Sequence, residues 1–200
     1  MILFRPPSTA TIESFLARQK RSGLSYRDIG ATAGNPPERY VVDRTVRRLG
    51  SGEATFDAAV AALRKWKQFD LGWVQIVAPR AGVVAGEDVA IIAQVFGIWW
   101  LNGCRIVYVE DEATATARRF AFAYGTLADH VGEGEERFAI EMDEAGVVTF
   151  NVSAFSRPRH VLSRLAYPLM RAHQKQFGRE AADAMQRALA AEPAPVASPV

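Results

Sequence analysis

The sequence contains one cysteine among its 200 residues, Cys104, so no disulfide can form within the chain. That cysteine content suits a reducing compartment. The most apolar stretch, residues 89–101, is interrupted by Gln94 and Gly97 and falls short of the about 20 residues that span a bilayer. The first residues also lack the basic start and apolar core of a signal peptide. We therefore expect a soluble cytoplasmic protein with no membrane insertion.

The chain also lacks an excess of charge of either sign. It has 24 Lys and Arg against 22 Asp and Glu, a formal net charge of +2, which does not suggest a nucleic-acid partner. Basic residues do recur over residues 157–179, but without the interleaved aromatic residues that stack on bases. We interpret them as a solvated helix face, with weak binding to an anionic partner as the alternative. The hydrophobic share of 49% is ordinary for a folded globular domain.

Cofactor and metal motifs are missing as well. Gly50-Ser51-Gly52 lacks the third glycine of a dinucleotide fingerprint, so we interpret it as a tight turn before a helix, with Ser51 as its N-cap. His130 lies near Glu133, Glu135 and Glu136, but no spacing places three ligands on one wall. We predict no cofactor, no metal and an exposed acidic loop there.

Helical periodicity is present near the N-terminus. Ile12, Phe15 and Leu16 recur at helical spacing and predict a helix over residues 8–20. We expect residues 1–38 to form a short N-terminal helical extension. Apolar residues at helical spacing also predict a second helix over residues 53–69.

Alternating apolar residues predict seven strands, six of them consecutive. The short links between them favour an antiparallel meander, since parallel neighbours need long crossovers. Asn102-Gly103 is a strong hairpin signal, so we place a turn there, directly before Cys104, which we interpret as a small packed residue. The predicted strands cover residues 40–48, 73–78, 88–101, 104–110, 117–126, 135–142 and 147–155.

The last part of the chain predicts one long helix from Pro158 to about residue 190, kinked or split at Pro168. Its apolar stripe includes Leu162, Leu165 and Phe177. We predict an α+β fold in which a seven-stranded curved antiparallel sheet wraps around this helix. The predicted domain covers residues 39–190, and residues 191–200, rich in proline and small residues, form a disordered tail.

Strand parity places most large apolar side chains of the last three strands on one face, which the helix stripe must cover. Tyr124 and Glu136 fall on this apolar face, and Glu135 falls on the solvent face. A carboxylate on an apolar face is costly unless it is paired or hydrogen-bonded. Two interpretations of Glu136 follow. It is a structural acid at the start of the strand whose carboxylate contacts water or an arginine, or it is a functional group.

Several short motifs resemble a family of bacterial and plant proteins known as domain of unknown function nineteen-ninety. The resemblance covers roughly residues 24–190 and implies no established activity. The family's order of elements is similar to that of the START-like, or helix-grip, superfamily, which includes the Bet v 1-like proteins; this implies a tendency toward apolar cavities. The motifs are Leu24-Ser25-Tyr26, Gly30-Ala31-Thr32, Leu49-Gly50-Ser51-Gly52, Trp66 with Trp73, Tyr124-Gly125-Thr126-Leu127, His130, Gly134-Glu135-Glu136-Arg137-Phe138 and Phe155-Ser156-Arg157-Pro158.

Three functions stay open on the sequence alone. The chain binds an apolar or amphipathic small molecule between sheet and helix, or it is an enzyme that uses His130 and Glu136 as acid and base in the same cavity, or its interior is filled and it is structural. Oligomeric state is not predicted, and the tryptophans serve as cavity wall or as simple core. The candidate ligand-binding residues are Trp66, Trp73, Trp100, Phe122, Tyr124, His130, Glu136 and Arg157.

Overall fold

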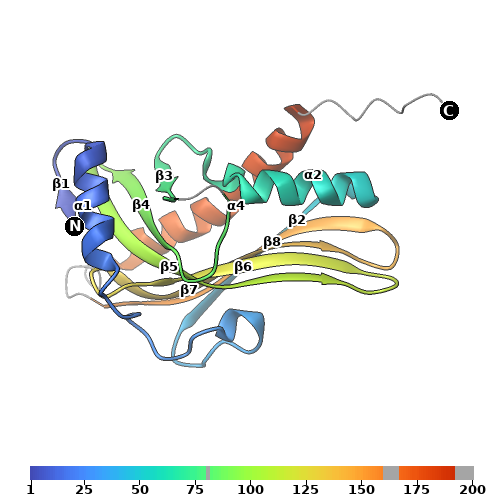
Figure 1. Ribbon diagram of the computed structural model, residues 1–200, viewed down its shortest axis with the longest axis horizontal. Helices are drawn as coiled ribbons and strands as arrows, with labels where there is room; N and C mark the ends of the chain where they lie inside the picture. The colour runs from blue at the N-terminus through green and yellow to red at the C-terminus, as the bar shows by residue number, and fades with distance from the viewer. Residues whose placement is uncertain (80–81, 160–166, 192–200) are drawn as a thin grey trace.

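The computed structural model describes residues 1–79, 82–159 and 167–191 (Figure 1). Its helices are α1 (Thr9–Gln19), α2 (Glu53–Arg64) and α4 (Tyr167–Ala191), with two 3-10 turns, η1 (Ala31–Ala33) and η2 (Lys67–Phe69). Its strands are β1 (Ile2–Leu3), β2 (Val41–Ser51), β3 (Val74–Val77), β4 (Asp88–Val95), β5 (Ile98–Ala113), β6 (Arg118–Thr126), β7 (Gly132–Met142) and β8 (Val147–Pro158).

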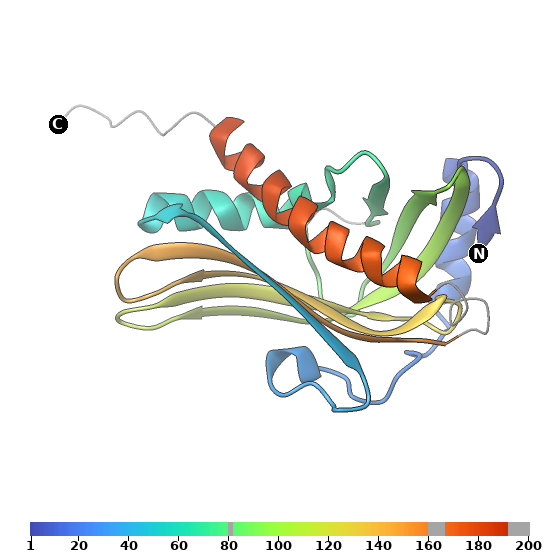
Figure 2. The same cartoon turned by 180° about the vertical axis from the view of Figure 1, so that it is seen from behind.

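All strand pairs of the sheet are antiparallel, in the order β2-β8-β7-β6-β5-β4-β3. This confirms the predicted seven-stranded antiparallel sheet. The two-residue strand β1, which was not predicted, pairs with β5 outside this path. The sheet curls, so that β4 and β5 rise toward α4 at one end while β2 crosses beneath α4 at the other (Figure 2).

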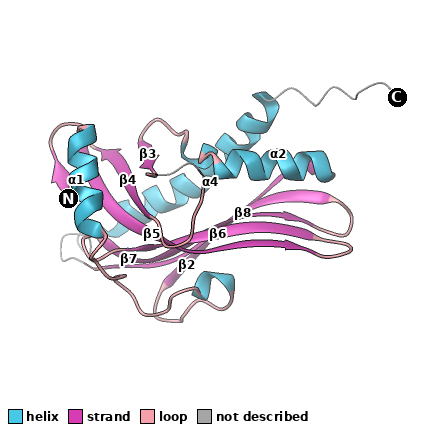
Figure 3. Cartoon of the chain, viewed as in Figure 1, coloured by secondary structure: helices cyan, strands magenta, loops and turns pink. Residues whose placement is uncertain are grey.

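Helices α2 and α4 lie on the concave face of the sheet (Figures 1 and 3). The core between them contains Phe120, Phe138 and Phe150 from β6, β7 and β8, with Met185 from α4, all fully buried. These are the strand positions that alternation assigned to the apolar face. The helix-grip arrangement expected from the sequence is therefore confirmed.

The convex face of the sheet is also covered, which the sequence did not predict. Phe15 and Leu16 of α1 pack against Ala90 and Ile92 of β4. Residues 24–40, including η1, cross the sheet near β7 and β8, on the side opposite the two long helices (Figure 1). Because β4 has apolar neighbours on both faces, its sequence is continuously apolar rather than alternating.

The predicted turn at Asn102-Gly103 is wrong. Val95 pairs with Ile98, so the β4–β5 hairpin turns at Phe96 and Gly97, whose φ angles are 51° and 76°. Two residues with positive φ are what a tight two-residue hairpin requires, and a phenylalanine gives no sequence signal for that conformation. Asn102-Gly103 lies inside β5. Gly103 is needed there because a Cβ would meet the Gln19 side chain at 3.0 Å.

The long helix begins later than predicted. Pro158 is the last residue of β8, paired with Gly132, and α4 begins at Tyr167. Pro168 lies in the first turn of the described helix, and residues 160–166 before it lie outside the described residues, so the predicted kink or split there stays a prediction. Leu162, Leu165 and the predicted disordered tail after residue 191 lie outside the described residues. No helix in the described part of the chain has the length and apolarity to cross a bilayer.

Candidate functional site

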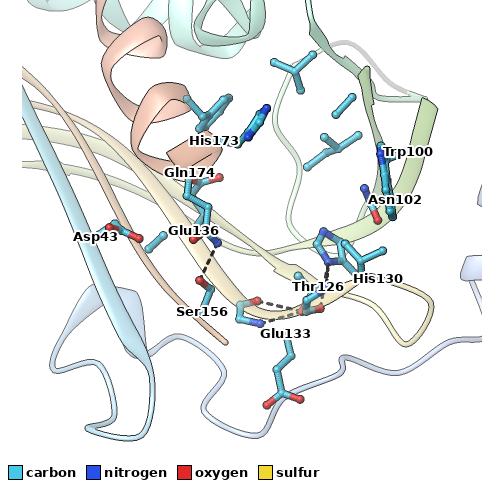
Figure 4. A pocket seen from close by; sticks show the side chains of 18 of the residues that line it. Asp43, Trp100, Asn102, Thr126, His130, Glu133, Glu136, Ser156, His173 and Gln174 are labelled. Atoms are coloured by element: carbon cyan, nitrogen blue, oxygen red, sulfur yellow. Dashed lines mark hydrogen bonds between the residues drawn. The ribbon is translucent and has the colours of Figure 1, made fainter. Parts of the chain in front are cut away.

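A cavity of about 1080 Å³ lies between the concave face of the sheet and α4. Figure 4 shows side chains from both sides pointing into it, among them His173 and Gln174 of α4 and Trp100 and Asn102 of β5. β4 and β5 curl toward α4 at this end of the sheet (Figure 2).

The polar floor of the cavity is a tyrosine–glutamate pair. Tyr124 of β6 and Glu136 of β7 are register partners across the two strands, so their side chains stand next to each other on the concave face. The Tyr124 hydroxyl donates a hydrogen bond to the Glu136 carboxylate. Burial, reinforced by Glu136, raises the pKa of Tyr124 well above its usual value, so it stays a donor.

Glu136 is an acid without a cation beside it. Burial raises its pKa to about 7; the hydrogen bond from Tyr124 lowers the pKa, and the negative charge of Asp43 raises it further. The nearby Arg171 guanidinium holds Asp43 with both of its terminal nitrogens. No ion pair involves Glu136 among the described residues, although the side chain is partly exposed to the cavity that it lines.

His130 approaches the cavity from the loop between β6 and β7. Its Nδ1 lies 3.0 Å from both the backbone N and O of Gly132. Burial lowers the pKa of His130 to about 4, so the ring is neutral at physiological pH. Nε2 has no hydrogen-bond partner in the described part of the chain.

Asn102 is the polar residue on the opposite wall. It is 7% exposed, and its Oδ1 is buried without a hydrogen-bond partner. Figure 4 shows it beside Trp100 among the residues that line the cavity. The oxygen has almost no accessible surface, so this acceptor without a donor among the described residues is a local cost of burial.

Aromatic rings form the wall under α4. The rings of Phe69 and Phe177 are 5.2 Å apart, and those of Trp73 and His173 are 5.9 Å apart, all four residues lining the cavity. Trp73 Nε1 donates a 2.6 Å hydrogen bond to Glu180 of α4. This bond ties the indole of Trp73 to α4.

The structure brings most of the predicted ligand-binding residues together. Trp66 and Phe122 do not line the cavity; they pack against each other in the core with ring centroids 5.0 Å apart. Arg157 lies at the cavity edge, where its Nε donates to Glu133 at 2.5 Å. The remaining five predicted residues line the cavity interior or its loops: Trp73, Trp100, Tyr124, His130 and Glu136.

The expectation of an exposed acidic loop is wrong, and so is the placement of Glu135 in solvent. Glu135 is 3% exposed, because residues 24–40 cover the convex face at this point. Its carboxylate accepts hydrogen bonds from the Tyr26 hydroxyl at 2.6 Å, Gly30 N at 2.7 Å, and both N and Oγ1 of Thr32. Alternation separates the two faces of a strand but does not reveal what covers the second one.

Other residues of the site were missed by sequence reasoning. Asp43 lies on β2 and Gln174 on α4, two elements that are far apart in the sequence and meet only in the fold. Their neighbours in the sequence therefore give no sign that they line the cavity. Asn102 was assigned to a turn. Cys104, by contrast, is fully buried as predicted, and burial raises the pKa of its thiol. Within the described residues no three His, Cys, Asp or Glu side chains gather as metal ligands would.

Comparison with known proteins gives a family and a fold. The profile described as "Domain of unknown function (DUF1990)" matches residues 25–184. A UPF0548 protein of Dictyostelium discoideum is 32% identical over 207 residues, covering 94% of this chain and 96% of the relative. A UPF0548 protein of Deinococcus radiodurans is 36% identical over 200 residues, covering 94% and 98%.

Among solved structures, hypothetical protein jhp0584 from Helicobacter pylori superposes with a TM-score of 0.53 at 11% identity. The superposition covers 82% of this chain and 95% of that one. At such low identity the likeness shows a shared fold.

Proposed function

This chain belongs to the family described as a domain of unknown function (DUF1990), and we propose that it binds an amphipathic small molecule in the cavity between the sheet and α4. The observation that carries the proposal is the cavity of about 1080 Å³. Protein interiors are normally packed to the density of organic crystals, so a recess of this size beside a well-packed core offers room for a ligand. Ligand sites of proteins typically measure roughly 300–1,000 Å³.

The distribution of polar groups supports an amphipathic ligand rather than a purely apolar one. Phe69, Trp73 and Phe177 present an apolar wall on the α4 side. Glu136 presents a carboxylate from β7, and Asn102 adds a polar side chain from β5. Apolar walls with a few placed polar groups are the usual composition of a small-molecule site, where the polar groups fix orientation.

Fluorescence titration with an uncharged, environment-sensitive naphthalene dye tests this proposal. Ala154 lines the cavity between Asp43 and Glu136, so Ala154→Phe fills it and weakens dye binding by about tenfold or more. Ser153→Phe is the matched control, since Ser153 is the neighbouring residue on the opposite face of β8. Equal dye affinity in both variants and the wild type would contradict binding in this cavity. Native mass spectrometry of protein from its own host then identifies the natural ligand.

Catalysis in the same cavity is the second candidate, favoured by one observation. Burial moves the pKa of Glu136 to about 7, where a carboxyl group can give or take a proton at neutral pH. The test is to incubate the identified ligand with wild type and Glu136→Gln and to follow its mass. Turnover by the wild type that Glu136→Gln loses supports an enzyme, and an unchanged ligand supports a binding protein.

A further inference from the structure

We infer that the ligand is an organic cation, an amine whose ammonium group pairs with Glu136 while its apolar body lies against the aromatic wall. The inference rests on the proposed function and adds the chemical class of the ligand. It comes from Glu136, a buried acid that has no cation beside it among the described residues.

Most acids that line the cavity have strong partners inside the protein. Asp43 is bound by Arg171, and Glu133 by the Arg157 Nε at 2.5 Å. Glu135 receives four hydrogen bonds from residues 24–40. Glu136 differs, because among the described residues its one hydrogen bond comes from the neutral Tyr124 hydroxyl.

The surroundings make Glu136 costly as an isolated anion. A buried carboxylate needs an opposite charge or several donors, and here the charge that acts on the pKa of Glu136 is the negative Asp43. Burial already raises the pKa of Glu136 to about 7, the direction expected for an acid that lacks a cation. A ligand ammonium supplies both the charge and the donors that the site lacks.

The aromatic rings of the cavity also favour a cation. Phe69 and Tyr124 lie with ring centroids 6.5 Å apart, and Phe177 packs on Phe69 at 5.2 Å. Aromatic faces next to a carboxylate attract organic cations through their quadrupoles.

A ligand of the opposite charge, an anion, would find a different site at the edge of the cavity. Lys175 and Arg179 are exposed on α4 at the edge of the cavity, where an acidic headgroup would find cations. A ligand bound that way would carry its charge toward solvent and leave Glu136 without a partner. The two arrangements predict opposite preferences for the charge of a probe, so one experiment separates them.

The experiment measures affinities of three aryl-alkyl compounds with one carbon skeleton, ending in an amine, an alcohol or a carboxylic acid. Isothermal titration is run at slightly alkaline pH, where the amine is protonated and Glu136 is ionised. We expect the wild type to bind the amine roughly ten- to hundredfold more tightly than the alcohol, as a charge-assisted hydrogen bond provides. The acid binds more weakly than the alcohol.

Glu136→Gln keeps the shape of the side chain and removes its charge, so the amine and the alcohol then bind within about threefold of each other. Glu141→Gln, on the same strand but outside the cavity, keeps the wild-type preference. The uncharged dye reports the cavity independently. If the wild type binds the dye but binds the alcohol or the acid as tightly as the amine, the inference of a cationic ligand is wrong and the proposed function stands. Absence of binding by the dye and all three compounds overturns the proposed function as well.

Discussion

Glu136 and His130 are two titratable residues of one cavity whose environments shift them in opposite directions. Burial disfavours the charged form of each, which raises the pKa of an acid and lowers that of a base. The pKa of Glu136 thus rises from 4.5 to about 7, and the pKa of His130 falls from 6.5 to about 4. Both groups can therefore be neutral together near neutral pH, which lowers the cost of burying them in the absence of a charged partner.

These shifts predict two opposing contributions to the pH dependence of stability. Between pH 4.5 and about 7 the folded state holds the Glu136 proton that the unfolded state has lost, so its contribution to the free energy of unfolding falls as pH rises. Between about 4 and 6.5 the unfolded state binds the His130 proton instead, so that contribution rises with pH. In the wild type the two slopes largely cancel.

Single variants separate the contributions of Glu136 and His130 to the pH dependence of stability. Relative to the wild type, Glu136→Gln makes stability rise more steeply with pH over the His130 window, by up to about 1.4 kcal/mol per pH unit. His130→Gln makes it fall with pH over the Glu136 window by a similar amount. Urea denaturation at a series of pH values measures both slopes. Parallel pH profiles for the wild type and both variants would show that neither residue is shifted as described.

Glu135, one residue before Glu136, has a structural role that a variant can measure. Glu135→Gln replaces one carboxylate oxygen, which accepts hydrogen bonds, by an NH2 group. That NH2 group then faces other donors, the backbone N–H and hydroxyl groups of residues 24–40. We expect a loss of about 2–4 kcal/mol in the free energy of unfolding, measured by urea denaturation. Glu141→Gln, at a partly exposed position with ion pairs to Arg119 and Arg137, loses less than about 1 kcal/mol. Equal losses in the two variants would mean that residues 24–40 are not held by this carboxylate.

At the scale of elements, the β4–β5 hairpin carries avoidable strain. Phe96 has a φ of 51° and is 76% exposed, with its ring 6.2 Å from that of His173. Phe96→Asn places a residue that tolerates this conformation before Gly97, and we expect a gain of about 1 kcal/mol in stability. Gly97→Ala, at a φ of 76°, loses about 1 kcal/mol. Thermal denaturation followed by circular dichroism compares them, and a loss of stability in Phe96→Asn would show that the ring contact outweighs the strain.

The same hairpin shows where sequence reasoning succeeds and where it fails. Alternation in β6, β7 and β8 correctly predicted the concave face, because one face is apolar and the other polar along each strand. In β4 and β5 both faces are apolar, since α1 covers one and the core covers the other. Periodicity then gives no register, and the turn was placed by the Asn-Gly signal alone. The left-handed Phe96 could not be found from its residue type.

At the scale of the whole molecule, many of the motif residues behind the family resemblance meet at one place. Tyr26 lies over Gly125, where a Cβ would approach its hydroxyl to 2.1 Å, and Ser25 bonds to Thr126. Gly134 leaves room for the Phe155 carbonyl oxygen. These residues attach residues 24–40 to the convex face of the sheet, directly behind the cavity floor. The sequence indicated that these motifs belong together, but not that they form a buried contact around Glu135.

This attachment also explains how the protein tolerates an empty space on the concave side. The sheet is packed on its convex face by α1 and residues 24–40 and on its concave face by α2 and the second half of α4. The cavity lies beside the first half of α4, among Leu169, His173 and Phe177. The packed core and the proposed ligand site thus occupy different parts of the same sheet, so a variant can change the proposed site without disrupting the core.

A cavity-filling variant tests that separation directly. Ala93 of β4 lines the cavity, so Ala93→Leu buries about three more carbon atoms in existing space and raises the free energy of unfolding by about 1–2 kcal/mol. Dye binding weakens in the same variant. Gln94→Leu, exposed on the other face of β4, gains no such stability and keeps dye binding. If Ala93→Leu instead destabilises the protein, as overpacking of a filled interior does, the third interpretation of the sequence, a structural protein with a solid core, is the correct one.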